Sequence, residues 1–130
     1  MILLDTNICI YIINGVLRVQ EQSKRYKPAD TYISAVSVAE LMYGAVKSKN
    51  PEATKDKIYA FISKINVADF GASDAVEYGN IRAYLTQKGE LIGALDMLIA
   101  AQAVVNGFKL ITNNIREFQR VPNIILENWV

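Results

Sequence analysis

Four acidic side chains are the groups in this sequence best suited to chemistry. Asp5 ends the apolar run Ile2–Leu4, and Asp96 interrupts an apolar stretch in the last third of the chain. Glu40 and Glu117 each lie close to the expected start of a helix. Carboxylates gathered in one place repel one another, and a hard divalent cation such as Mg²⁺, or alternatively Mn²⁺, relieves that repulsion. A cation held in this way can activate water and stabilise a leaving oxygen, which is the chemistry of metal-assisted hydrolysis.

The composition excludes the common alternatives to carboxylate chemistry. The chain has 130 residues, with no histidine and one cysteine. It therefore has no His-Ser or His-Cys nucleophilic pair, no ordinary zinc site and no disulfide within the chain. The single cysteine, Cys9, lies between isoleucines and is expected to be a small buried hydrophobe. Any hydrolysis would have to depend on carboxylates.

Asp96 gives the clearest indication of a buried acidic site. The helix expected to begin at Ala94 is apolar on nearly all sides, and Asp96 is the only charge in its first three turns. Burying a carboxylate is costly unless it is paired or bound to a metal. Complementing the positive start of a helix contributes only about 0.3 to 1 kcal/mol at an exposed position. We therefore favour a functional role for Asp96.

The other three acids each have a structural alternative. Asp5, taken alone, is typical of an N-terminal helix cap. Ser37 and Glu40 have the spacing of a Ser-x-x-Glu capping box, so capping and metal binding stay equally open for Glu40. Asn114 and Glu117 fit an Asn-x-x-Glu cap at least as well as they fit metal ligation.

The elements that would position these acids alternate along the chain. The expected strands are residues 2–4, 32–34, 65–68, 109–112 and 124–129, the last at an edge. The expected helices are residues 8–13, 16–26, 35–46, 53–64, 71–88 and 94–106, and a short one opening at residue 113. Alternating strands and helices indicate an α/β sandwich whose strands are mostly parallel, so that helix starts converge on one edge of the sheet. Residues 1–130 are expected to form a single domain.

Charge and hydropathy add weaker limits. The 14 basic and 13 acidic residues give a net charge of +1, so the whole chain has no strong bias toward polyanions. If four acids surround a cation, nine acidic and fourteen basic residues remain in the rest of the chain. That balance allows a rim of basic residues around an acidic site. Arg82 is expected to pair with an acid rather than to reach a phosphate. No apolar stretch approaches the roughly 20 residues that cross a bilayer, and the first residues lack the positive region of a signal peptide, so we expect a cytoplasmic protein without membrane contact.

Four short motifs lie in order along essentially the whole chain: Leu4–Asn7, Ser37–Gly44, Leu95–Ala100 and Thr112–Phe118. In type and spacing they resemble the motifs of the PIN-domain ribonucleases, and more closely those of the VapC toxins of bacterial toxin-antitoxin modules. Each motif is weak alone, whereas four at the family's spacing make a specific match. The resemblance implies a PIN-like three-layer sandwich, in which helices flank a small, mostly parallel sheet.

The resemblance also implies roles for individual residues. The catalytic acids would be Asp5, Glu40, Asp96 and Glu117. Asp5 and Asp96 would be direct magnesium ligands, and Glu40 would complete the metal site. Thr6, Thr112 and Asn114 would be supporting polar residues. Many family members have aspartate where this chain has Asn114, so the number of ions and the residue that orients the water stay open.

By resemblance, the activity would be magnesium-dependent endoribonuclease cleavage. The substrate would be RNA, often a tRNA cut in or near its anticodon loop, and the partner would be a small VapB-like antitoxin that blocks the site. Family members usually dimerise, so a homodimer is expected.

Two other classes of protein fit the sequence less well. A signalling domain phosphorylated on Asp5 would need a lysine at a later strand end, where Thr112 stands, and a hydrolase with an aspartate nucleophile would need an acid at Asn7. A catalytically inactive PIN-like module that binds RNA or protein stays open as the alternative.

Overall fold

The structure is a computed structural model that describes residues 1–130, and its centre is a five-stranded sheet in the order β3-β2-β1-β4-β5. Every neighbouring pair of strands is parallel. The strands are β1 (Ile2–Leu4), β2 (Thr31–Ser34), β3 (Asn66–Ala68), β4 (Lys109–Ile111) and β5 (Ile125–Glu127). The helices are α1 (Thr6–Ile13), α2 (Leu17–Ser23), α3 (Ala35–Val46), α4 (Pro51–Ile62), α5 (Ala72–Lys88), α6 (Ala94–Asn106) and α7 (Ile115–Phe118), with a 3₁₀ turn, η1, at Pro28–Asp30.

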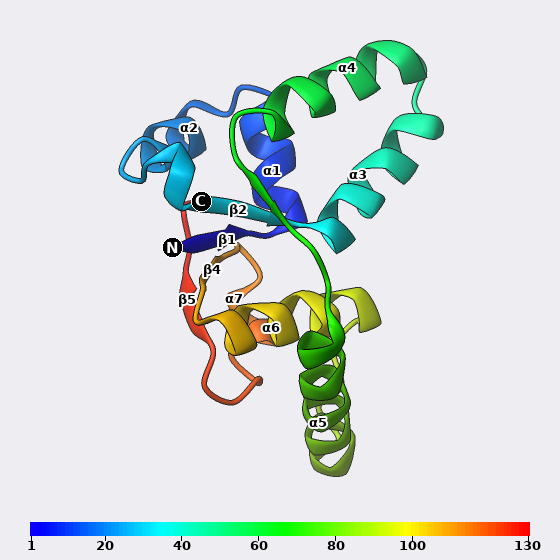
Figure 1. The fold of residues 1–130 in the computed structure, drawn as a ribbon, viewed down its shortest axis with the longest axis vertical. Helices are drawn as coiled ribbons and strands as arrows, with labels where there is room; N and C mark the ends of the chain where they lie inside the picture. Colours follow the sequence, from blue (N-terminus) through cyan, green and yellow to red (C-terminus); the bar gives the residue numbers. More distant parts are fainter.

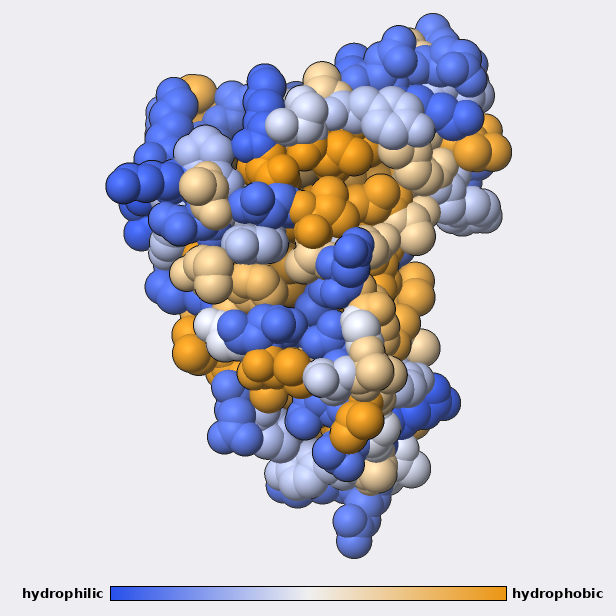
Figure 2. Space-filling view, viewed as in Figure 1, coloured by the Kyte–Doolittle hydropathy of each residue, from blue (hydrophilic) through white to orange (hydrophobic).

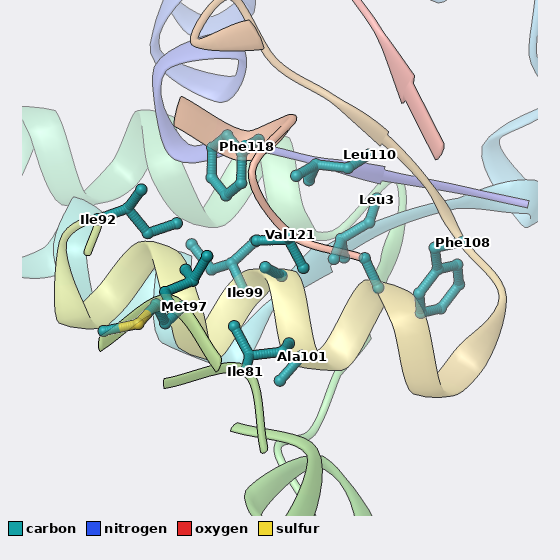
Figure 3. Packing of buried hydrophobic residues seen from close by; sticks show 13 residues of the cluster. Leu3, Ile81, Ile92, Met97, Ile99, Ala101, Phe108, Leu110, Phe118 and Val121 are labelled. Atoms are coloured by element: carbon teal, nitrogen blue, oxygen red, sulfur yellow. The ribbon is translucent and has the colours of Figure 1, made fainter. Parts of the chain in front are cut away.

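The helices form a layer on each side of the sheet, with α1 to α4 on one side and α5 to α7 on the other (Figure 1). Two apolar cores result, because successive side chains of a strand point to opposite faces. Leu3 and Leu110 face the core under α5, α6 and α7, as Figure 3 shows. Ile2, Leu4 and Ile111 face the other core, which includes the buried Cys9. These features confirm the predicted three-layer α/β sandwich, and the sheet is parallel throughout.

Several predicted boundaries were wrong by two or three residues. Helix α2 ends at Ser23 rather than Tyr26, because the amides of Lys24, Arg25 and Tyr26 each bond to the carbonyl three residues back and tighten the chain out of the α-helix. Helix α4 begins at Pro51 rather than residue 53, since proline suits the first helical position and the Asn50 side chain caps the Ala53 amide at 3.4 Å.

The long helix α5 confirms its predicted core face and corrects one predicted contact. Ile81 and Leu85 are buried, and Tyr78 packs against the same cluster. Arg82 forms no ion pair and instead donates a hydrogen bond to the Tyr78 hydroxyl at 2.6 Å on the exposed side of the helix. None of the helices is both long enough and apolar enough to cross a membrane.

Candidate functional site

Asp5 lies at the carboxyl end of the central strand and is 5% exposed. Its Oδ1 accepts a hydrogen bond of 2.8 Å from the Thr6 amide, so the side chain does cap α1. Its Oδ2 accepts a second bond of 2.7 Å from the Thr112 hydroxyl, which follows β4. Burial raises the pKa of the Asp5 carboxyl, the bonds from Thr112 and Thr6 oppose that rise, and the charge of Glu40 adds to it. The Asp5 side chain therefore both caps α1 and binds the residue that follows β4.

Glu40 is tied to the same place through Thr6. The Thr6 Oγ1 lies 2.7 Å from Glu40 Oε1 and 2.8 Å from the hydroxyl of Ser37. The capping-box alternative for Ser37 and Glu40 is wrong, because Ser34 occupies the cap of α3 and accepts the Val36 amide at 3.0 Å. Both side chains are thus free to turn toward α1.

Asp96 lies in the first turn of α6, half-buried beside the other acids. Desolvation, followed by the charges of Asp5, Glu40 and Glu117, raises the pKa of its carboxyl from 3.8 to about 6. No hydrogen bond opposes this rise. The three neighbours that act on Asp96 show that the four predicted acids share one electrostatic environment.

The residues after β4 complete the group. The Thr112 hydroxyl that binds Asp5 also accepts a 3.0 Å bond from the Asn114 amide. Asn114 occupies the predicted N-cap position of α7, but its side chain makes no cap bond and instead donates a 3.1 Å bond to Glu117 Oε2. All seven residues singled out from the sequence therefore lie together at the carboxyl edge of the sheet.

The donor set is composed entirely of oxygens and carries excess negative charge. No three acidic side chains approach closely enough in this structure to form a ligand cluster by themselves. Mg²⁺ commonly binds through only one or two carboxylates and keeps several of its waters, so the looser arrangement fits this ion. The unopposed repulsion around Asp96 is the feature that a divalent cation would relieve.

Two cavities lie on the side of the sheet that α1 to α4 cover. One of about 230 Å³ is lined by Glu40, Gly44 and apolar residues of α1, α3 and α4. The larger, of about 400 Å³, lies between α1, α2 and α4, and none of the four acids lines it. Figure 2 shows apolar surface in this region, framed by hydrophilic side chains. The larger cavity is therefore separate from the acidic centre.

Two polar residues of this region were not predicted as part of the site. Ser37 was interpreted only as a cap, although a serine inside an apolar helix start was a signal of another contact. Asn113 donates a 3.3 Å bond to the Tyr11 hydroxyl, and its Oδ1 is buried without a partner. No signal in the sequence singles out Asn113 from Asn114.

Comparison with known proteins supports the motifs found in the sequence. The family model described as the PIN domain matches residues 2–124. Ribonuclease VapC2 of Rickettsia felis is 42% identical, over 98% of this chain and 96% of that protein. The tRNA(fMet)-specific endonuclease VapC of Salmonella typhimurium is 38% identical, over 98% of this chain and 96% of that protein. The crystal structure of DNA-bound VapBC from Salmonella typhimurium contains a chain that is 38% identical, with a TM-score of 0.93 and complete coverage of both chains.

Proposed function

This chain belongs to the PIN domain family and is a ribonuclease of the VapC type, and from this membership we propose that it is a magnesium-dependent endoribonuclease toxin that cuts tRNA near the anticodon loop. The observation that carries the proposal is the half-buried Asp96 carboxylate, which no hydrogen bond satisfies and which three further acids surround. The relative named as a tRNA(fMet)-specific endonuclease supports tRNA as the substrate class. Residues 1–130 would act as a single PIN-like domain in the cytoplasm.

In this proposal Asp5 and Asp96 hold the cation directly, and Glu40 completes the metal site. A bound Mg²⁺ would activate water and stabilise the charge that develops on the leaving oxygen. Thr6 and Thr112 fix both oxygens of Asp5, so this carboxylate is held in its orientation before RNA binds. Glu117, fixed by Asn114, faces the same region and would position the attacking water.

Cleavage of total tRNA by the antitoxin-free protein tests the proposal. Asp5→Asn and Asp96→Asn should each lower the cleavage rate by at least about 100-fold, because each removes a charged ligand from the metal site. A chelator should have the same effect on the unaltered protein, and added Mg²⁺ should reverse it. Asp56→Asn changes an exposed acid of α4 and serves as the control. Cleavage that survives the chelator or both variants would contradict the metal mechanism, and RNA binding without cleavage would identify a non-catalytic module.

We further propose that a VapB-like antitoxin covers the apolar surface between α1, α2 and α4. The solved relative is a VapBC assembly, and the 400 Å³ cavity offers Ile12, Ile13 and Phe61 to apolar side chains of a protein partner. Lys57 and Lys64 at the same cavity favour acidic residues nearby in that partner. Adding a cognate VapB-like antitoxin should stop tRNA cleavage at a one-to-one ratio. Continued cleavage in a stable complex of the two would contradict a blocking role.

A homodimer is the proposed oligomeric state. Tyr43 and Val46 on α3 are 67% and 61% exposed, and Val76 on α5 is 68% exposed, so these helices carry apolar side chains that a second copy could cover. Light scattering on the antitoxin-free protein should give the mass of two chains. A mass of one chain across the micromolar range would contradict the proposal.

A further inference from the structure

Thr6 holds two of the four acids at once. Its backbone amide donates to Asp5 Oδ1, and its hydroxyl lies 2.7 Å from Glu40 Oε1. Thr6 opens α1, whereas Glu40 lies in the second turn of α3, so this single residue joins the starts of two helices. The orientation of the Thr6 hydroxyl therefore decides how Glu40 is presented beside Asp5.

Thr6 is the centre of a group of three polar side chains. Thr6 Oγ1 lies within hydrogen-bond distance of two oxygens, at 2.7 Å from Glu40 and 2.8 Å from the Ser37 hydroxyl. The Thr6 hydroxyl is the donor in both contacts, and because a hydroxyl has one hydrogen, the two acceptors share it. The result is a relay of two hydrogen bonds that joins Ser37 to Glu40 through Thr6.

No other feature of the structure accounts for a serine at position 37. The side chain is completely buried, and Ser34 already provides the cap of α3. Ser37 makes no side-chain hydrogen bond except the one to Thr6. Alanine has a higher helix propensity and would suit an apolar surrounding better. The hydroxyl is therefore explained by its contact with Thr6.

We propose that Ser37 is a positioning residue of the metal site, which fixes the Thr6 hydroxyl and thereby holds Glu40 in place to complete the binding of a divalent cation at Asp5 and Asp96. This inference rests on the proposed function. In this inference Ser37, which is not one of the four acids, affects the affinity of the site for the cation. Ser37 touches neither the cation nor the RNA, so its effect passes entirely through Thr6.

The chain offers a matched control for this role. Ser34 and Ser37 are both completely buried serines at the start of α3. Ser34 accepts the Val36 amide as a helix cap, whereas Ser37 contacts Thr6. Replacing either by alanine removes one buried hydroxyl, from the cap of α3 at Ser34 or from its first turn at Ser37, and only the change at Ser37 reaches Glu40.

The first experiment measures Mn²⁺ binding by electron paramagnetic resonance and, separately, the Mg²⁺ concentration that gives half-maximal tRNA cleavage. We expect Ser37→Ala to raise both the Mn²⁺ dissociation constant and the half-maximal Mg²⁺ concentration by about 3- to 10-fold, with a smaller effect on the rate at saturating Mg²⁺, as for the loss of one hydrogen bond. Ser34→Ala should lower the melting temperature of the metal-free protein and leave both metal measurements unchanged. Ser37→Thr, which keeps the hydroxyl, should restore metal binding.

A double-mutant cycle with Thr6→Val tests whether Ser37 acts through Thr6. Thr6→Val removes the hydroxyl at nearly constant shape, and it should weaken Mn²⁺ binding at least as much as Ser37→Ala does. Adding Ser37→Ala to Thr6→Val should then produce no further loss. Equal and additive losses, or a Ser37→Ala protein with unchanged Mn²⁺ binding, would overturn the relay. An unaltered protein that neither binds Mn²⁺ nor cleaves RNA would instead overturn the proposed function, and the role of the relay with it.

Discussion

Asp96 shows the cost of assembling an acidic centre. Its carboxyl is partly desolvated and lies near the charges of Asp5, Glu40 and Glu117, and together these raise its pKa to about 6. Because the pKa in the folded protein lies above its ordinary value of 3.8, ionising Asp96 destabilises the fold. The penalty is absent below the ordinary value and complete above the raised one. Near neutral pH without a cation, the protein therefore carries this penalty in full.

Asp96→Asn should consequently stabilise the metal-free protein while abolishing cleavage. We expect a gain of about 1 to 2 kcal/mol in the free energy of unfolding at pH 8 with chelator present, allowing for solvent screening. Urea unfolding measures this gain, and Asp56→Asn is again the control. A variant less stable than the unaltered protein under these conditions would contradict the repulsion at Asp96.

Residue types and spacing predicted that the four acids meet at one edge of the sheet, but not which side chains connect them. Asp5 and Asp96 were recognisable because a charge in an apolar segment needs an explanation. The contact between Thr6 and Ser37 joins residues 31 positions apart and depends on how α1 lies against α3. Local sequence patterns carry no information about the packing of α1 against α3. The spacing of Ser37 and Glu40 therefore indicated only a helix cap.

At the scale of elements, competition among neighbouring caps explains why the predicted capping contacts were wrong although the helix itself was predicted. Ser34 and Ser37 both precede plausible helical residues, and the chain uses Ser34 because Ser34 ends β2 with an extended backbone. Asn114 likewise keeps the cap position of α7, but its side chain bonds to Glu117. Helix and strand identities were predicted correctly from periodicity, whereas the choice of cap depended on tertiary hydrogen bonds.

Helix α5 provides a test of local backbone energetics away from the acids. A Cβ added to Gly79 would meet nothing within 4 Å, so Gly79→Ala should stabilise the protein by about 0.5 to 1 kcal/mol through reduced backbone entropy. Gly89 ends the same helix with a φ of 67°, so Gly89→Ala should destabilise it by about 1 kcal/mol. Denaturant midpoints at constant slope measure both effects. Midpoints shifted in the same direction would contradict these conformational roles.

At the scale of the whole molecule, Glu127 of the last strand fixes the segment that follows α2 to the sheet. Its carboxylate accepts hydrogen bonds from Lys109 and Tyr26, each at 3.1 Å, and also from Arg25 and Trp129. Partial burial alone would raise the pKa of Glu127, but these donors, with the charge of Arg25, outweigh it and lower the pKa below 4.5. The buried Trp129 closes the core on the α1 side.

The lowered pKa gives this junction a defined pH dependence. Its contribution is fully present above the ordinary value of 4.5 and is lost as the pH falls through the lower value of the folded protein. Glu127→Gln should therefore reduce the free energy of unfolding at pH 7, and the difference from the unaltered protein should shrink at pH 3. Glu52→Gln is the matched control, because its 84% exposed side chain forms only a surface pair with Lys55. A loss independent of pH would show that the ionic contacts contribute little.

The order of strands in the sheet has a consequence for how this protein comes into being. β1 is translated first, yet its neighbour β4 and the hydroxyl that holds Asp5 come from a segment 107 residues later. A nascent chain therefore has no assembled centre until the segment that carries Asp96, Thr112 and Glu117 has been made. For an enzyme proposed to cut tRNA, this order of synthesis delays activity until the last third of the domain has been translated.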